Sequence, residues 1–210
     1  NEPLAAHCYA KSASLGNIEG QANYGFCLIN GYGTPLDIRR GFSLIKQSSE
    51  KNCLKGIYFY GLCNMHGVGV EKANFQLAEE NFKRASNGSE YDINNSTQLI
   101  SCRSKYQLGL LMENQKRYFE SAKYFRMAAF TALESNMNFY SSQSFVFPEA
   151  LYYYGCCLLK GIGIPPDLAT ACQFFKIAHL QGHEYASFAY AKCIIEKQMN
   201  SDDSEISKSI

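Results

Sequence analysis

The sequence lacks the features that would direct it to a membrane or to nucleic acid. No stretch approaches the roughly 20 consecutive apolar residues that a membrane-spanning helix needs. The formal net charge is only +1, and no cluster of Lys and Arg stands out from it. Such a weak field does not attract nucleic acid or an anionic membrane surface. The chain also begins Asn1-Glu2-Pro3, without an initiator Met or the basic start of a signal peptide, so we expect it to be part of a longer protein.

What the sequence does contain is a repeated turn pattern. Of its 210 residues 46% are apolar and 19% charged, which is enough material for one sizeable folded unit. The pattern Gly-x-Gly occurs three times, beginning at Gly31, Gly67 and Gly161, and the first two copies lie 36 residues apart. A period of 20 to 50 residues is typical of a solenoid, whose units bury their apolar faces by stacking on one another.

Small residues recur at two positions before each expected turn. Each member of the first set follows a large residue, and the second set lies five residues earlier. Small residues on a helix allow a neighbouring helix to approach closely. We therefore predict a first helix in each unit, helix A, and call the first set the small-residue column: it is Gly25, Gly61, Gly109, Gly155 and Ala191, and the second set is Gly20, Gly56, Ser104, Ala150 and Ala186.

A second amphipathic stretch follows each turn, as in residues 37–48 and 167–178. Asp37 and Asp167 stand where a helix N-cap is expected. Gly16, Asn52 and Gly88 recur every 36 residues, and Gly182 occupies the matching place later in the chain. These residue types tolerate positive φ, so we predict that they end a second helix, helix B. Each unit is thus a helix-turn-helix, and the predicted fold is all-α.

The third unit departs from this pattern because no Gly-x-Gly separates its two helices, so we predict a shorter turn there. Two segments also lengthen the spacing between units, and one of them carries Phe139, Tyr140, Phe145 and Phe147. The predicted organisation is helix B of a truncated preceding repeat at 1–16, repeat 1 at 17–52, repeat 2 at 53–88, an insertion at 89–100, repeat 3 at 101–132, an insertion at 133–147, repeat 4 at 148–182, a final helix A at 183–196 and a disordered tail at 197–210.

The repeated columns resemble the SEL-one-like repeat (SLR) family over roughly residues 1–196. The resemblance implies a right-handed α/α superhelical solenoid that serves as an adaptor between proteins, and it implies no reaction. The sequence departs from the family in lacking the usual Trp of helix B, since it contains no Trp. Repeat 3 is more similar to a tetratricopeptide repeat, with that family's spacing at Leu108, Gly109, Ser121, Phe125 and Ala128.

Three patterns suggest chemistry, and each is better explained by structure. A Gly-x-Gly before a helix can cradle a phosphate, but the nucleotide fingerprint is incomplete and the copies are periodic. His179 and His183 have the i, i+4 spacing of metal ligands, although Gly182 ends the helix between them and no third ligand follows. Cys63 and His66 lack an orienting carboxylate. We predict a noncatalytic chain with no cofactor, no metal, and no nucleic acid, membrane or small-molecule partner.

The nine cysteines favour free thiols over disulfides. Cys27, Cys63, Cys157 and Cys193 all lie two residues after the small-residue column, on successive helices A that should be about 8 to 10 Å apart. Disulfides need Cα atoms within about 7 Å. Buried thiols in a reducing compartment predict a cytoplasmic location. The lumen of the endoplasmic reticulum is the alternative, because glycosylation sequons begin at Asn87, Asn94 and Asn95.

In helix-pair solenoids, helices A line the concave face, and two positions per helix point into it. These lie three residues before and one residue after the small-residue column, and polar residues stand at the helix ends. We predict an apolar groove with a polar rim that binds a protein or peptide partner. The alternatives are the recognition arm of an enzyme, such as a protein kinase, whose catalytic domain lies outside this segment, and a luminal quality-control adaptor. The predicted groove residues are Phe26, Asn30, Tyr58, Leu62, His66, Tyr106, Leu110, Asn114, Tyr152, Lys160 and Phe188.

Overall fold

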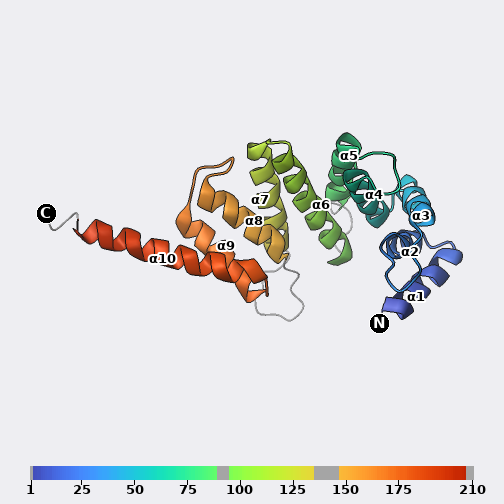
Figure 1. Ribbon diagram of the computed structural model, residues 1–210, viewed down its shortest axis with the longest axis horizontal. Coiled ribbons are helices and arrows are strands. Elements are labelled where there is room, and N and C mark those ends of the chain that lie inside the picture. Colours follow the sequence, from blue (N-terminus) through green and yellow to red (C-terminus); the bar gives the residue numbers. More distant parts are fainter. Residues whose placement is uncertain (1, 89–94, 135–146, 207–210) are drawn as a thin grey trace. The chain divides into compact units, whose positions relative to one another are not determined.

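The computed structural model describes residues 2–88, 95–134 and 147–206, and these residues form ten helices and no strand (Figure 1). Successive helices contact one another from α1 to α5 and from α7 to α10, as a stack of helix pairs requires. This arrangement confirms the predicted all-α solenoid. The helices are α1 (Glu2–Ser14), α2 (Ile18–Asn30), α3 (Ile38–Glu50), α4 (Leu54–His66), α5 (Phe75–Asn87), α6 (Asn95–Asn114), α7 (Tyr118–Glu134), α8 (Pro148–Lys160), α9 (Leu168–Leu180) and α10 (Glu184–Ile206).

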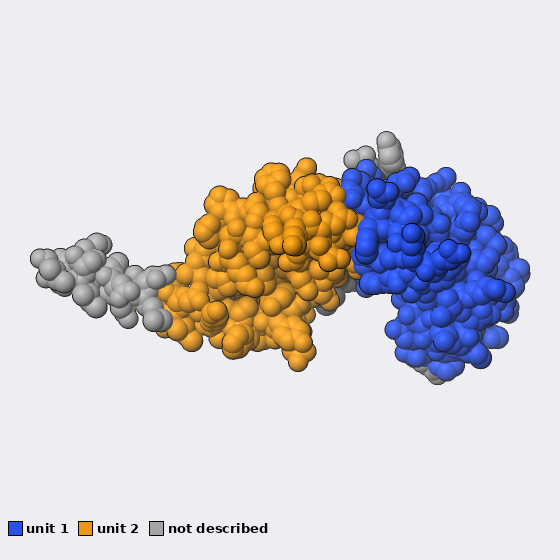
Figure 2. Space-filling model, turned by 45° about the horizontal axis from the view of Figure 1, so that its top comes forward, with its two compact units in different colours: residues 1–104 blue, residues 105–210 orange. Residues whose placement is uncertain are grey.

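The chain divides into two compact units, residues 1–104 and 105–210 (Figure 2). Unit 1 holds α1 to α5 and the start of α6, and unit 2 holds the end of α6 with α7 to α10. Within unit 1, α2 pairs with α3 and α4 pairs with α5 as helices A and B. Within unit 2, α8 pairs with α9. No helix among the residues described is both long enough and apolar enough to cross a membrane.

Each Gly-x-Gly pattern forms the predicted turn between helix A and helix B. In the first copy both glycines have positive φ, 71° at Gly31 and 65° at Gly33, and the other two copies repeat this conformation. The Gly31 N–H donates to the Cys27 carbonyl and so ends α2. The second glycine also allows close packing, because a Cβ at Gly69 would lie 2.6 Å from the Phe42 ring. The glycines therefore determine turn geometry, as predicted.

The predicted caps of helix B are confirmed with one exception. Asp37 and Asp167 each accept an N–H bond of 3.0 Å from the residue three positions later. Gly16, Asn52 and Gly182 all have positive φ, whereas Gly88 has a φ of −67° and the prediction of a left-handed cap there is wrong. The reason is that the turn before α5, from Gly67 to Asn74, is one residue longer than the turn before α3, so position 88 comes one residue too early.

The small-residue column fits helix A against helix B of the same repeat. Gly61, Gly109 and Gly155 are buried, and a Cβ added to each would lie 2.5 to 2.8 Å from the ring of a helix B phenylalanine. The second set of small residues meets helix B of the preceding repeat, as a Cβ at Gly56 would lie 2.5 Å from the Ser48 hydroxyl. Helix A is thus packed on two sides, through two small-residue positions five residues apart. The phenylalanines are Phe82, Phe125 and Phe175.

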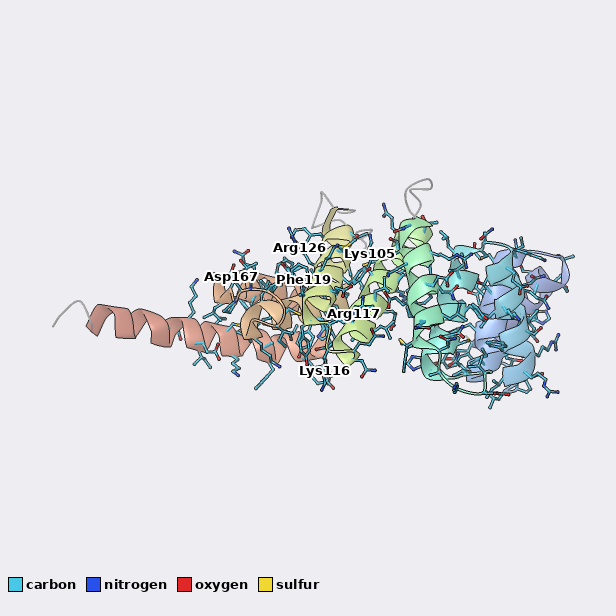
Figure 3. All side chains as sticks on the ribbon, turned by 90° about the horizontal axis from the view of Figure 1, so that it is seen from above. Lys105, Lys116, Arg117, Phe119, Arg126 and Asp167 are labelled. Carbon is cyan, nitrogen blue, oxygen red and sulfur yellow. The ribbon has the colours of Figure 1, made fainter. Side chains whose placement is uncertain are left out.

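Repeat 3 has the predicted shorter turn. α6 ends at Asn114 and α7 begins at Tyr118, and Lys116 adopts a φ of 61° between them. Figure 3 labels Lys116 and Arg117 at this turn. Residues 95–100, which the sequence analysis placed in an insertion, form the first turns of α6. Residues 89–94 and 135–146 lie outside the described residues, so the insertions keep the status of predictions, as does the sequon at Asn94.

The final helix A is longer than expected. We predicted that it ends at Glu196 and that a disordered tail follows, whereas α10 continues to Ile206. Residues 197–206 contain neither Gly nor Pro, so nothing in the local sequence stops the helix. The expectation of disorder was based on polar composition, and a polar composition alone does not end a helix.

Candidate functional site

Unit 1 contains an apolar pocket between two successive helices A. It has a volume of about 170 Å³, and α2, α3, α4 and the turn after α4 all contribute to it. The structure brings four of the predicted groove residues together here: Phe26 and Asn30 from α2, and Leu62 and His66 from α4. None of the lining residues carries a carboxylate, ammonium or guanidinium group. The rest of the lining is Ile29, Ile45, Phe59, Cys63 and Val68.

The floor of the pocket is aromatic and aliphatic. Phe26 is stacked on Phe59 with ring centroids 4.5 Å apart and an angle of 16° between the planes. Val68 reaches the pocket because its N–H bonds to the Cys63 carbonyl at 2.9 Å, which folds the turn back over the end of α4. The Gly67 conformation makes this fold possible. An offset aromatic stack of this kind gives the pocket a rigid wall.

The polar atoms of the pocket lie at its edge. Asn30 and His66 are exposed residues at the ends of α2 and α4. The Asn30 side-chain amide nitrogen donates to the Phe26 carbonyl at 2.8 Å, and the Asn30 side-chain oxygen takes no part in this bond. Cys63 is buried, and burial raises the pKa of its thiol to about 12. Cys63 is therefore a neutral apolar wall residue, and its protonated state argues against a role as nucleophile.

Tyr58 does not contribute to the pocket surface. It is only 6% exposed and packs against Phe82 of α5 with ring centroids 6.0 Å apart. The matching residue on α2, Ala22, is fully buried. In unit 1 the position three residues before the small-residue column thus faces helix B, whereas the position one residue after it faces the pocket. Of the two positions predicted to line a groove, only the one after the column contributes to this pocket, and its role in binding stays a prediction.

In unit 2 some of the predicted groove residues are packed against other side chains, and the others are exposed. Tyr106 is half-buried among aromatic rings, with centroids 5.3 to 5.9 Å from those of Phe125, Phe147 and Tyr153. Tyr152 is stacked on His183 with centroids 4.5 Å apart. Leu110 is half-buried, while Asn114 and Lys160 are exposed at their helix ends. Phe188 on α10 is 77% exposed.

His183 is a helix cap rather than a metal ligand. Its Nδ1 accepts the Ala186 N–H at 3.2 Å at the start of α10. Burial lowers its pKa, which favours the neutral ring that this bond requires. His179 contacts the Ser187 hydroxyl at 2.7 Å instead of sharing a ligand with His183. Among the residues described, no group of three or more His, Cys, Asp or Glu side chains is placed to hold a metal ion.

All nine cysteines are free, as predicted. The column of Cys27, Cys63, Cys157 and Cys193 is buried along successive helices A. Burial raises the pKa of the Cys157 thiol to about 12 and that of Cys193 to about 11. These side chains behave as small apolar residues of the stack.

Sequence reasoning missed five of the nine lining residues, which are Ile29, Ile45, Phe59, Cys63 and Val68. Ile29 follows Phe26 by three residues, and Phe59 precedes Leu62 by three, so both lie on the same helix surfaces as predicted residues. This i, i+3 spacing was a usable signal. Val68 and Ile45 come from a turn and from helix B, and only the tertiary structure brings them to the same place.

Comparison with family models finds the Sel1 repeat in four segments of the chain. They are residues 1–17, 18–53, 54–89 and 148–183, which together make up more than half of the sequence. The segment between residues 89 and 148, which holds repeat 3, lies outside the four matched segments. No curated protein sequence matches the chain.

Solved structures of other repeat proteins are similar to this one, and two of them serve for comparison. A Sel1 repeat protein from Oxalobacter formigenes has a TM-score of 0.67 and 20% sequence identity, over 90% of this chain and 67% of that one. A protective antigen of uropathogenic Escherichia coli that displays an SLR fold has a TM-score of 0.45 and 19% identity, over 91% of this chain and 44% of that one. At these identities the first likeness concerns the fold alone.

Proposed function

Because the chain belongs to the Sel1 repeat family, whose members are in general protein-interaction scaffolds, we propose that it is a noncatalytic adaptor that binds a protein or peptide partner. The observation that carries this proposal is the apolar pocket of unit 1. Its walls are contributed by consecutive repeats, so a bound partner would contact two neighbouring repeats at once rather than a single helix. The Cys63 thiol is neutral, which does not favour a nucleophile, and His183 caps a helix, which does not favour a metal ligand.

The pocket is suited to one apolar side chain of a partner. A cavity of about 150 Å³ lined by apolar side chains holds a benzene ring, and this pocket has about 170 Å³. Asn30 and His66 stand at its edge, where they can bond to the main chain of the partner. An apolar anchor surrounded by polar contacts is the usual composition of a recognition surface.

Selection from a library of random displayed peptides tests this proposal without a known partner. Peptides enriched on the wild-type chain should share one large apolar residue and should bind the Leu62→Glu variant at least tenfold more weakly. His66→Ala should weaken the same peptides to a smaller degree, because it removes only a rim contact. Circular dichroism and thermal melting of each variant check that the helices persist.

Leu15→Glu is the matched control, since Leu15 lies in unit 1, is 79% exposed and is not one of the residues that line the pocket. It should leave peptide binding unchanged. The proposal is overturned if no peptide is enriched, or if the enriched peptides bind the folded Leu62→Glu variant as tightly as the wild type.

A further inference from the structure

Helix α7 carries an apolar stripe on the side that faces solvent. Phe119 is 70% exposed, Met127 39% and Phe130 37%. They lie at positions i, i+8 and i+11, so they share one face of the helix over about three turns. Lys123 and Arg126 lie on the same face and are exposed. We call these five residues the outer stripe of α7, and Figure 3 labels Phe119 and Arg126 within it.

The same face of helix B is polar in the first two repeats. The helix B residue that lies against the small-residue column fixes the comparison, and this residue is Ile45, Phe82 and Phe125 in repeats 1 to 3. Counted from it, the positions of Phe119, Met127 and Phe130 hold only exposed polar or charged side chains in α3 and α5. Stacking of the repeats therefore does not require apolar residues there, and exposed apolar residues rimmed by polar ones are typical of an interaction site. The polar side chains are Arg39, Gln47 and Glu50 in α3, and Gln76, Arg84 and Asn87 in α5.

One end of the stripe is held by the neighbouring repeat of unit 2. The Phe130 ring lies edge-on to Tyr154 of α8 and Phe174 of α9, with centroids 6.4 and 6.0 Å away. The Arg126 guanidinium lies over the Phe130 ring, 5.5 Å from its centroid. At the other end, Phe119 stacks on no ring among the residues that the structure describes. The stripe thus offers one ordered aromatic ring and one open one.

The charged groups of the stripe are both positive. Within the described part of the chain, neither Lys123 nor Arg126 forms an ion pair with a carboxylate. The carboxylates of Glu120 and Asp167 are already bonded, the first to Arg117 at 2.5 Å and the second to the first turn of α9. An acidic side chain of a partner is therefore the complementary group.

We propose that the outer stripe of α7 docks an amphipathic helix of a partner protein whose apolar face is flanked by aspartate or glutamate. Apolar side chains at helical spacing are the anchors on which a second helix packs. The acidic flank would pair with Lys123 and Arg126 while the apolar face covers Phe119 and Met127. The stripe belongs to unit 2, so this inference does not depend on the pocket of unit 1.

The charge of this surface favours a protein partner over a lipid surface. Recognition of anionic lipids uses clusters of about four to eight Lys and Arg, whereas the stripe holds two cations in a chain of net charge +1. Two cations are sufficient for the acidic flank of one helix. The same number makes nucleic acid a poor fit, because its binding depends on many phosphate contacts.

Selection from a displayed library of alanine-rich helical peptides, randomised along one face, tests the inference. The bait is the full 210-residue chain with Leu62→Glu, which disables the unit 1 pocket. Peptides are first depleted on the same bait carrying Phe119→Glu as well, so that those needing the stripe remain. The enriched peptides should combine apolar residues with Asp or Glu. They should bind a Met127→Glu variant, which takes no part in the selection, about tenfold more weakly.

Reversal of charge tests the acidic flank directly. Lys123→Glu combined with Arg126→Glu should weaken the enriched peptides about tenfold. Replacing the acidic residues of a peptide with Lys should restore its binding to this double variant and weaken its binding to the bait. Lys46→Glu is the matched control, because Lys46 is exposed at the position of Arg126 in repeat 1, and it should leave binding unchanged. Circular dichroism checks each variant, and Met127→Ser replaces Met127→Glu if the glutamate lowers helix content.

Several results contradict the inference. No peptide survives the depletion, the survivors lack acidic residues, or the charge reversal leaves their affinity unchanged. Binding of the chain to phosphatidylserine vesicles that Phe119→Glu abolishes would assign the stripe to a membrane instead. Self-association in sedimentation that Phe119→Glu abolishes would assign it to a second copy. Because the bait lacks a working unit 1 pocket, none of these results bears on the adaptor proposal.

Discussion

Single glycines at the turns serve two purposes that can be separated by mutation. Gly69 has a φ of 75° and lies against the Phe42 ring, whereas Gly16 has a φ of 85° and open space around its missing Cβ. A residue with a side chain is strained by the left-handed backbone conformation at either position. Only at Gly69 does a side chain also collide with a packed ring.

Replacing Gly69 with Ala should therefore destabilise the protein more than replacing Gly16. We expect Gly16→Ala to lower the free energy of unfolding by about 1 kcal/mol, from backbone strain alone. Gly69→Ala should lower the free energy of unfolding by about 1 to 3 kcal/mol more than this, because the Cβ would lie 2.6 Å from Phe42. Urea denaturation of the two variants measures the difference, and equal losses would contradict the packing role of the second turn glycine.

At the scale of elements, the turn of repeat 3 joins helix A to helix B as the Gly-x-Gly turns do, but it has fewer residues and no glycine. α6 and α7 are joined by residues 115–117, and the chain reverses at Lys116, whose N–H bonds to the Glu113 carbonyl at 2.9 Å. A lysine at a φ of 61° is strained in a way that glycine is not. This turn is therefore a weak point of the stack.

Lys116→Gly should stabilise the protein by about 0.5 to 1 kcal/mol, because the relief of left-handed strain exceeds the extra entropy of glycine in the unfolded chain. Lys123→Gly is the matched control in the same unit. Lys123 is exposed inside α7, where glycine costs about 1 kcal/mol. Chemical denaturation should show opposite signs for the two variants, and a loss of stability in both would refute the strain at residue 116.

At the scale of the whole molecule, stability should be distributed locally. Successive helices contact one another from α1 to α5 and from α7 to α10, and the chain separates into two compact units. In such a stack, energy is approximately a sum over repeats and their nearest-neighbour contacts. Damage in one unit should spread little into the other.

Gly61→Leu tests this locality. Its side chain would meet Phe82, 2.7 Å from the position of the added Cβ, and overpacking should cost about 1 to 3 kcal/mol. Hydrogen exchange should accelerate in α4 and α5 while α8 and α9 keep their protection. Equal acceleration in all four helices would show that the protein unfolds as one cooperative body.

The periodic residues of the sequence were sufficient to predict the fold. The turn glycines, the small-residue column and the caps Asp37 and Asp167 act through local backbone preference and one neighbouring helix, so their spacing alone predicts helix pairs. The same logic failed at Gly88, because one additional residue in a turn shifts the cap without altering the apparent period. It also failed for the end of α10, where polar composition predicted a disordered tail although the helix continues to Ile206.

The tertiary structure alone decided which of the predicted surface positions are open. Tyr58 and Phe188 occupy the same position in their repeats, yet one is buried and the other is exposed. Among the described residues α5 packs against α4, whereas no equivalent helix packs against α10. A residue's own neighbours in the sequence do not indicate which of these two situations holds. The pocket of unit 1 likewise depends on Val68 and Ile45 meeting Phe26 from three separate elements. Local sequence sets the helices and turns through short-range backbone energetics, whereas exposure is a property of what packs on each face.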